Sequence, residues 1–357
     1  MFEIFKIKFI NKHNSNIWDQ SWSSYGNYLI SISSDQDLKI YGPLNCSLNH
    51  NLTSSYFREY FKNWGLLSNL KLNTWKRSLK TLLSNHSNNL MFLGSFNGKG
   101  VFFKFKFIKK KKFFYMIDFI AFLYDYSEIK DSIFLTEDAC FSISSRNKSI
   151  SIWKKNDKNS IECLYHFDEL ESEVKSLAYD NLSNSIIAVS FNGYLYKFVN
   201  KDDNWIFGSK LKFSLHTIWS VYFLRESQSL IFTTNDGEIF MLKNKVFSQM
   251  NKYYFGDQIN VYWEISKQSN LKTQSSQLNN LLILTKRNGF LKILNSKTLI
   301  SDMKTLHRHK CRVFKNLVSY IEVGLIENFD FHPLIQNIIS FSSYFNELFI
   351  FTLNFRK

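Results

Sequence analysis

"SSRNKSISIW", residues 144–153, decides the fold, because a tight polar turn leads into strict alternation of small or polar residues with apolar ones, ending on a tryptophan. Asn147-Lys148 lies in the turn. Alternation with a period of two indicates a half-buried strand, so the stretch predicts a turn that feeds a strand. One turn and one strand define no fold, and the significance of the stretch depends on whether it recurs.

The pattern recurs six more times. The further copies are SSDQDLKIY (33–41), SFNGKGVFF (95–103), SFNGYLYKF (190–198), NDGEIFML (235–242), RNGFLKIL (287–294) and YFNELFIF (344–351). Another alternating run precedes the turn, as in residues 17–32 and 174–189. Each unit therefore predicts about three inner strands, with an outer strand in the variable segment before the next unit, which is typical of the blades of a WD-type β-propeller.

We therefore predict that residues 1–357 form one all-β domain, a seven-bladed WD40-type β-propeller. A closed ring of blades leaves no long exposed sheet edge. The N-terminal strand, about residues 2–10, is expected to close the last blade, which ends near Phe355. The longer gaps between copies predict insertions at 46–73, at Lys109–Lys112 and at 266–280, the last a flexible loop rich in Ser, Gln and Asn.

The composition is that of a globular chain with a sizeable core, since 45% of the 357 residues are hydrophobic and 21% are charged. A net charge of +15 raises nucleic acid or an acidic membrane as partners. The lysines are spread along the chain, however, and their abundance fits A/T-rich codons, so neither partner is expected. The dense run Lys109–Lys112 is either a solvated hairpin tip or a phosphate-binding finger. No signal peptide or transmembrane span is expected.

The sequence contains no catalytic or metal-binding motif, so neither an enzyme nor a cofactor is expected. Its four cysteines lack CxxC spacing and suit a reducing compartment; they are Cys46, Cys140, Cys163 and Cys311. The Gly-His pair of the WD consensus is absent, and His216 lies two positions late in its unit. We therefore expect the histidines to be surface or packing residues, with packing, mainly of Phe, in place of the polar network of WD repeats.

In a WD-type blade, the residue before the turn Asp or Asn projects onto the narrower top face, around the central channel. Here those residues are Ser34, Phe96, Arg146, Phe191, Asn235, Arg287 and Tyr344. The first inner strands add Trp18, Lys175 and Trp219. Aromatic residues and arginines on an exposed surface are the usual hot spots of protein interfaces.

Two interpretations stay open for several of these residues. Arg146 either clamps a partner's carboxylate with two parallel hydrogen bonds or is an ordinary solvated residue. Phe96 and Phe191 either contact a partner or pack between blades. An acidic stretch before the fourth blade is either a solvated loop or a docking patch for a basic partner, and consists of Glu169, Glu171 and Glu173.

Residues 144–223 resemble the WD-repeat subunit of the cytosolic iron–sulfur protein assembly targeting complex. The likeness lies in SSRNKSISIW, in VKSLAYDNLSNSIIAVSFNGYLYKF (174–198), in DDNW (202–205) and in TIWSVYF (217–223). The family has an SRDKS motif at the first of these places, whose functional top-face arginine corresponds to Arg146. Lys148 and Trp205 match as well; Trp205 is expected to be structural, and Lys148 joins the candidate protein-binding residues.

The resemblance implies a non-enzymatic scaffold of the cytoplasm, present also in the nucleus. Such an adaptor docks a MIP-type subunit, a HEAT-repeat subunit, an iron–sulfur carrier and client apoproteins, and holds no cluster itself. The alternatives are a generic WD scaffold of another pathway, such as ribosome assembly, or a nucleic-acid-associated propeller that uses Lys109–Lys112.

Overall fold

The elements whose bounds the structure describes are all β-strands. The computed structural model describes residues 2–11, 13–23, 26–44, 61, 63–71, 78–85, 90–108, 114–124, 127–135, 140–156, 160–168, 170–224, 228–235, 238–243, 250–254, 259–262, 281–286, 291–295, 326–332, 338–343 and 346–355. The described strands pair into seven separate antiparallel sheets, six with four strands and one with three.

The sheets follow one another along the chain, and we number them from the first. Sheet 1 is β2 (Ile17–Trp22), β3 (Leu29–Ser33), β4 (Asp37–Pro43) and β5 (Trp64–Lys71). Sheet 2 is β6 (Leu79–Asn85), β7 (Leu90–Ser95), β8 (Lys99–Ile108) and β9 (Phe114–Tyr124). Sheet 3 is β10 (Ile129–Phe134), β11 (Cys140–Ser145), β12 (Ile150–Lys155) and β13 (Ile161–Phe167). Sheet 4 is β14 (Val174–Asp180), β15 (Ser185–Ser190), β16 (Tyr194–Lys201) and β17 (Asn204–Lys212).

The last three sheets complete the set. Sheet 5 is β18 (Ile218–Leu224), β19 (Ser229–Thr234), β20 (Glu238–Lys243) and β21 (Met250–Tyr254). Sheet 6 is β22 (Ile259–Tyr262), β23 (Leu281–Lys286) and β24 (Leu291–Asn295). Sheet 7 is β25 (Ile326–Phe331), β26 (Ile338–Ser343), β27 (Glu347–Phe355) and β1 (Phe2–Asn11).

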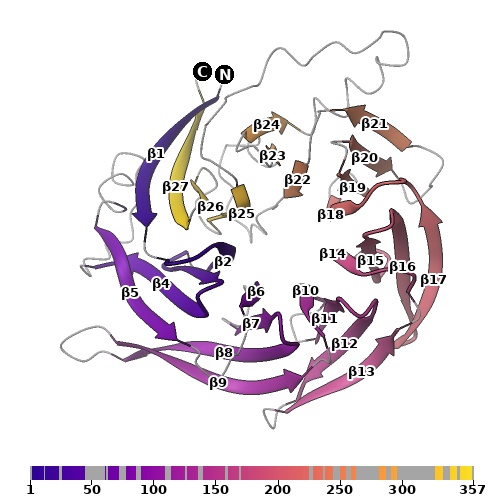
Figure 1. The fold of residues 1–357 in the computed structure, drawn as a ribbon, viewed down its shortest axis with the longest axis horizontal. Coiled ribbons are helices and arrows are strands. Elements are labelled where there is room, and N and C mark those ends of the chain that lie inside the picture. Colours follow the sequence, from indigo (N-terminus) through magenta and orange to yellow (C-terminus); the bar gives the residue numbers. More distant parts are fainter. Residues whose placement is uncertain are drawn as a thin grey trace.

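The sheets are arranged like the blades of a propeller, with the first strand of each toward the centre (Figure 1). These inner strands contact one another in sequence, from β25 through β2, β6, β10, β14 and β18 to β22. Sheet 7 joins the two ends of the chain, since β1 pairs antiparallel with β27 from Phe2 opposite Phe355 to Asn11 opposite Glu347. The first strand is therefore the outermost strand of the last sheet.

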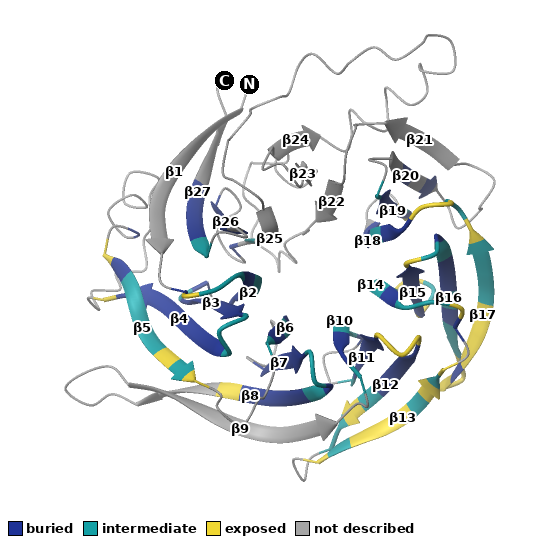
Figure 2. Cartoon of the chain, in the orientation of Figure 1, coloured by how far each residue is buried: buried dark blue, intermediate teal, exposed yellow. Residues whose placement is uncertain are grey.

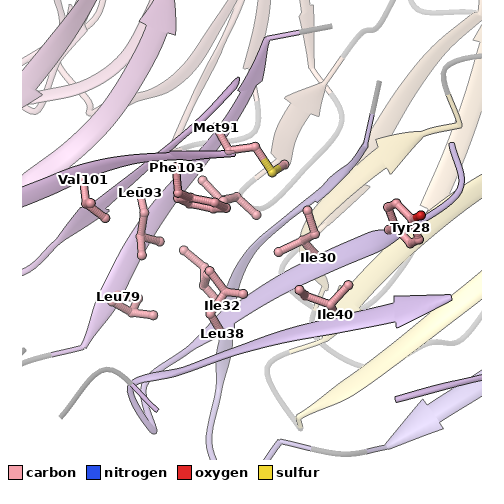
Figure 3. Packing of buried hydrophobic residues seen from close by; sticks show 11 residues of the cluster. Tyr28, Ile30, Ile32, Leu38, Ile40, Leu79, Met91, Leu93, Val101 and Phe103 are labelled. Carbon is pink, nitrogen blue, oxygen red and sulfur yellow. The ribbon is translucent and has the colours of Figure 1, made fainter. Parts of the chain in front are cut away.

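Apolar side chains fill the spaces between neighbouring sheets. Between sheets 1 and 2, for example, Ile32, Leu38 and Ile40 pack against Leu93 and Phe103 (Figure 3). Similar clusters lie between sheets 2 and 3, 3 and 4, 4 and 5, and 7 and 1. A sheet that is covered on both faces buries successive residues of its strands, which explains why all five residues of β3 are buried.

Aspartate side chains link three inner strands to the inner strand of the next sheet. Asp19 accepts a hydrogen bond from the Leu82 amide of the next sheet (2.7 Å), and Asp131 accepts one from the Leu177 amide (2.8 Å). Asp330 does the same for the Trp22 amide across the junction of sheets 7 and 1 (2.8 Å). Burial raises the pKa of Asp19 to about 8 and raises the pKa of Asp131. These side chains add a hydrogen bond to the apolar packing between neighbouring sheets.

The raised pKa of Asp19 makes the stability of the fold depend on pH. The folded state keeps the proton up to about pH 8, whereas the unfolded chain releases it near 3.8, so this contribution is full in acid and is lost as the pH rises through that window. We expect the wild type to lose about 2 kcal/mol of unfolding free energy relative to Asp19→Asn between pH 6 and 8. Urea unfolding of both proteins measures this difference, and a difference that stays constant with pH would contradict the assignment.

The expectation that packing replaces the polar network of WD repeats is wrong for sheet 1. His13 Nδ1 donates to Asp35 of the turn (3.2 Å), and the Ser31 hydroxyl donates to Nε2 (2.7 Å). The His13 side chain is fully buried, and burial lowers its pKa despite Asp35. Burial disfavours ionisation of Asp35 as well, but hydrogen bonds from His13 and the Asn14 amide outweigh it and hold its pKa below the ordinary value. His13 is thus a network residue, neither a surface residue nor mere packing.

The predicted insertion at 46–73 is also wrong in part. Residues 64–71 form β5, which pairs with β4 from Asp37 opposite Lys71 to Pro43 opposite Trp64 and completes sheet 1. Trp64 is buried against Trp22, with ring centroids 5.5 Å apart. The insertion at 266–280 and the run Lys109–Lys112 lie outside the described residues.

Candidate functional site

The turns between the second and third strands make the same backbone hydrogen bond in five successive sheets. In each, the amide before the turn Asp or Asn donates to the carbonyl just before the first strand, at 2.9–3.0 Å. The five donors therefore lie on one edge of the ring, which we call the top face, and are Ser34, Phe96, Arg146, Phe191 and Asn235. The second residues of the first strands line the same edge, and are Trp18, Lys80, Lys130, Lys175 and Trp219.

One aromatic–cation cluster joins sheets 1 and 2. The Trp18 and Phe96 rings lie 5.5 Å apart, and the Lys80 ammonium lies 4.1 Å from the Trp18 ring centroid. The Trp18 indole N–H donates to the Ser34 hydroxyl (2.6 Å), which fixes the ring. Trp18 and Phe96, both predicted top-face residues, are thus half-buried and contact each other.

A second cluster of the same composition joins sheets 4 and 5. The Lys175 ammonium lies 5.1 Å from the ring centroids of both Phe191 and Trp219. The Trp219 indole N–H donates to the Asn235 side chain (2.9 Å). Phe191 remains 51% exposed, so packing between sheets uses only part of its ring. Its free face is available for contact with a partner.

A chain of alternating charges occupies the sector between the two clusters. Arg146 lies 3.6 Å from Glu128, and Lys130 lies 2.8 Å from Glu128 and 3.7 Å from Glu173. Glu173 in turn pairs with Lys175. The Arg146 side chain is 67% exposed, whereas that of Lys175 is 12% exposed. Arg146 therefore lies at the solvent end of a network whose other members are largely enclosed.

The two aromatic–cation clusters and the charge chain between them combine four cations with two carboxylates, a net charge of two positive among these residues. The cations are Lys80, Lys130, Arg146 and Lys175, and the carboxylates are Glu128 and Glu173. Exposed aromatic surface beside excess positive charge is suited to an acidic partner that also brings apolar side chains.

Lys148, another predicted protein-binding residue, is exposed and adopts a left-handed backbone conformation with φ of 66°. The corresponding turn positions hold Gly98, Gly193 and Gln36, with φ of 77°, 81° and 65°. This conformation costs a residue with a Cβ atom about 1–2 kcal/mol and glycine almost nothing. A lysine at this position therefore stabilises the turn less than a glycine would.

Replacing Lys148 by glycine separates turn strain from binding. Lys148→Gly is expected to raise the unfolding free energy by about 0.5–1 kcal/mol, as is the matched control Gln36→Gly. If Lys148 also binds a partner, only Lys148→Gly weakens that binding. Urea unfolding measures the stabilities, and a destabilised Lys148→Gly with a stabilised Gln36→Gly would show that the lysine side chain supports the fold.

The structure thus places the predicted residues on one edge, as a Trp18–Phe96 cluster and a Lys175–Phe191–Trp219 cluster, with Arg146 and Lys148 in a turn of the sheet between them. Arg287 and Tyr344 lie outside the described residues. Three functional residues were not predicted from the sequence, namely Lys80, Lys130 and Glu128. Two of them could have been found, since the strand position that holds Trp18, Lys175 and Trp219 in three units holds Lys80 and Lys130 in the other two.

The acidic stretch before sheet 4 is paired within the chain. Glu171 forms an ion pair with Lys210, and Glu173 pairs with Lys175, while Glu169 lies outside the described residues. The hydrogen bond from Lys210 lowers the pKa of Glu171. These carboxylates are therefore largely neutralised by lysines of the same sheet, which does not favour a docking patch for a basic partner.

The described residues offer no cluster of three or more His, Cys, Asp or Glu side chains that could hold a metal ion. Cys140 and Cys163 are free thiols, and Cys46 and Cys311 lie outside the described residues. Within the described parts of the chain, no helix has the length and apolarity needed to cross a membrane. No family model matches the chain, and no curated protein sequence matches it either.

Proposed function

We propose that the chain is a closed seven-bladed propeller of the WD40 type that acts as a non-enzymatic scaffold. Three features support this proposal: the row of small sheets with contacting inner strands, the pairing of β1 with β27 across the chain ends, and the His13–Asp35–Ser31 network in sheet 1. The turn asparagines support it too, since Asn147 accepts a hydrogen bond from Ser149 as a turn aspartate would (2.6 Å).

The scaffold that fits best is the WD-repeat subunit of the cytosolic iron–sulfur protein assembly targeting complex. The observation that carries this proposal is Arg146, which lies in the stretch that resembles the family and is 67% exposed on the top face. The partners are then the MIP-type and HEAT-repeat subunits, an iron–sulfur carrier and client apoproteins, met in the cytoplasm and also in the nucleus. The chain itself holds no cofactor.

The geometry suggests how the top face would bind an acidic partner. The net positive charge attracts the partner during encounter. Glu128 holds one edge of the Arg146 guanidinium at 3.6 Å, which leaves its other N–H groups for a carboxylate of the partner. The exposed face of Phe191 would then cover an apolar side chain.

Two other functions remain as alternatives. A WD scaffold of another pathway would use the same face with different partners. A nucleic-acid-associated propeller is favoured by the net charge of +15 and by Lys109–Lys112. RNA binding at physiological salt that is lost on changing these lysines to glutamine would support the latter function, and the absence of such binding would exclude it.

Reconstitution tests the leading proposal. The purified chain is expected to form a stable complex with a purified MIP-type subunit, and this complex is expected to retain a client apoprotein during size-exclusion chromatography. If the chain elutes separately from the MIP-type subunit at micromolar concentrations of both, the assignment to the targeting complex is wrong, whereas the scaffold class would still stand.

A further inference from the structure

The outer edge of sheet 4 exposes two successive large apolar side chains, Ile206 and Phe207. β17 is the outermost strand of this sheet, so one side of its backbone pairs with no strand in the described part of the chain. Such an edge presents a row of N–H and C=O groups that can accept a further strand, and proteins usually protect it with charged residues or proline. The first half of β17, Trp205 to Ser209, contains neither.

This half of β17 also exposes large apolar side chains. Ile206 is 40% exposed and Phe207 is 49% exposed, and as successive strand residues they point to opposite faces of the sheet. Figure 2 shows the exposed residues along β17 on the rim of the ring. The outermost strand of sheet 3, β13, is exposed too, but it carries Glu162 and His166.

A β-bulge fixes the exposed Phe207. Phe207 pairs with Phe198 and Ser209 pairs with Lys197, so Gly208 is the extra residue between them. A Cβ atom at Gly208 would lie 3.1 Å from the Val199 side chain and 3.2 Å from the Lys197 carbonyl oxygen, which favours glycine there. One side of the Phe207 ring packs edge-on against Phe198, with centroids 5.6 Å apart. The edge is therefore preformed and its apolar side chain is held in place.

The two ends of the edge carry opposite charges. The turn before β17 contains Lys201, Asp202 and Asp203, a net charge of one negative, and all three residues are exposed. At the far end Lys212 is exposed, while Lys210 is paired with Glu171. A complementary antiparallel strand would therefore begin with an acidic residue beside Lys212 and end with a basic residue beside Asp202 and Asp203.

We propose that residues 204–209 of β17 are a docking edge for an extended segment of a partner protein. The segment adds to sheet 4 as an antiparallel strand, with alternating apolar side chains, an acidic N-terminal end and a basic C-terminal end. The surface lies on the rim, is separate from the top face, and does not depend on the proposed function.

Two peptides of identical composition test this proposal on the full chain. EVTVTVTK has the complementary charge order and KVTVTVTE the reverse. We expect EVTVTVTK to slow amide hydrogen exchange in residues 204–209 by about tenfold and to do so at several-fold lower concentration than KVTVTVTE. Ile206→Lys places a charge on the edge and should abolish the protection, whereas the matched control Leu182→Lys, at an exposed turn residue of the same sheet, should keep it.

Three results would overturn the proposal. One is equal protection by both peptides, which would show that the order of charges along the peptide does not direct its binding. Another is protection that persists in Ile206→Lys, which would place the peptide elsewhere. The third is slow exchange without peptide together with dimers in sedimentation that Ile206→Lys dissociates, which would identify a second copy of the chain as the occupant.

Discussion

Arg146→Glu is expected to weaken binding of the MIP-type subunit by about 100-fold, which corresponds to about 2.7 kcal/mol. The change replaces a donor of paired hydrogen bonds by a carboxylate, beside Glu128 and facing an acidic partner. Because the side chain is 67% exposed, the unfolding free energy should change by no more than about 0.5 kcal/mol. Isothermal titration calorimetry measures the affinity and urea unfolding the stability.

Two further variants control for charge and geometry. Lys154→Glu makes the same change from cation to carboxylate at an exposed position of sheet 3, away from the turn, and should leave the affinity unchanged. Arg146→Lys keeps the charge but cannot form two parallel hydrogen bonds, so it is expected to weaken binding of the MIP-type subunit about tenfold. If Arg146→Glu binds as tightly as the wild type, Arg146 is an ordinary solvated residue.

Gly26→Ala is expected to lower the unfolding free energy by more than about 3 kcal/mol, because it disturbs the junction of sheets 7 and 1. Gly26 has a φ of 66°, and a Cβ atom there would lie 2.0 Å from the His332 ring. His332 Nε2 donates to the Gly26 carbonyl oxygen (3.0 Å), and its ring lies 4.8 Å from that of Trp22. The clash therefore falls where the last sheet meets the first.

A double-mutant cycle separates the clash from the backbone strain. His332→Ala removes the ring that obstructs the new Cβ atom. In that background Gly26→Ala should lower the unfolding free energy only by the strain of the left-handed backbone conformation, about 1–2 kcal/mol. The coupling between the two changes, measured by urea unfolding, should exceed about 1 kcal/mol. Additive effects would show that His332 does not pack against Gly26 in solution.

The repeated turn was the strongest signal in the sequence because it is local. The alternation after each turn specifies a strand, and the polar turn residues specify the reversal, so both can be recognised without the rest of the chain. Residues 144–153 form the end of β11, the turn and the start of β12, so the predicted turn and strand are present. The strand begins with three buried residues and is not half-buried there, because sheets lie on both of its faces. An all-β arrangement of small antiparallel sheets follows directly from that pattern.

Features that depend on distant contacts were harder to predict. His13 lacks the glycine of the Gly-His pair, and only its distances to Asp35 and Ser31 reveal its role. The strand β5 lies in a long variable segment with no second copy to align it, so the sequence does not distinguish it from an insertion. The chain of charges from Arg146 to Lys175 joins sheets 3 and 4, and depends on side-chain reach between strands distant in sequence.

Hydrogen exchange of the full chain with and without a bound MIP-type subunit tests the central claim most directly. Partner binding on the top face predicts slower exchange in the turns at 34–36, 96–98, 146–148 and 191–193, with no change in the turn at 201–204. Protection confined to the outer strands, with exchange at 146–148 unaffected, would contradict a binding site centred on Arg146.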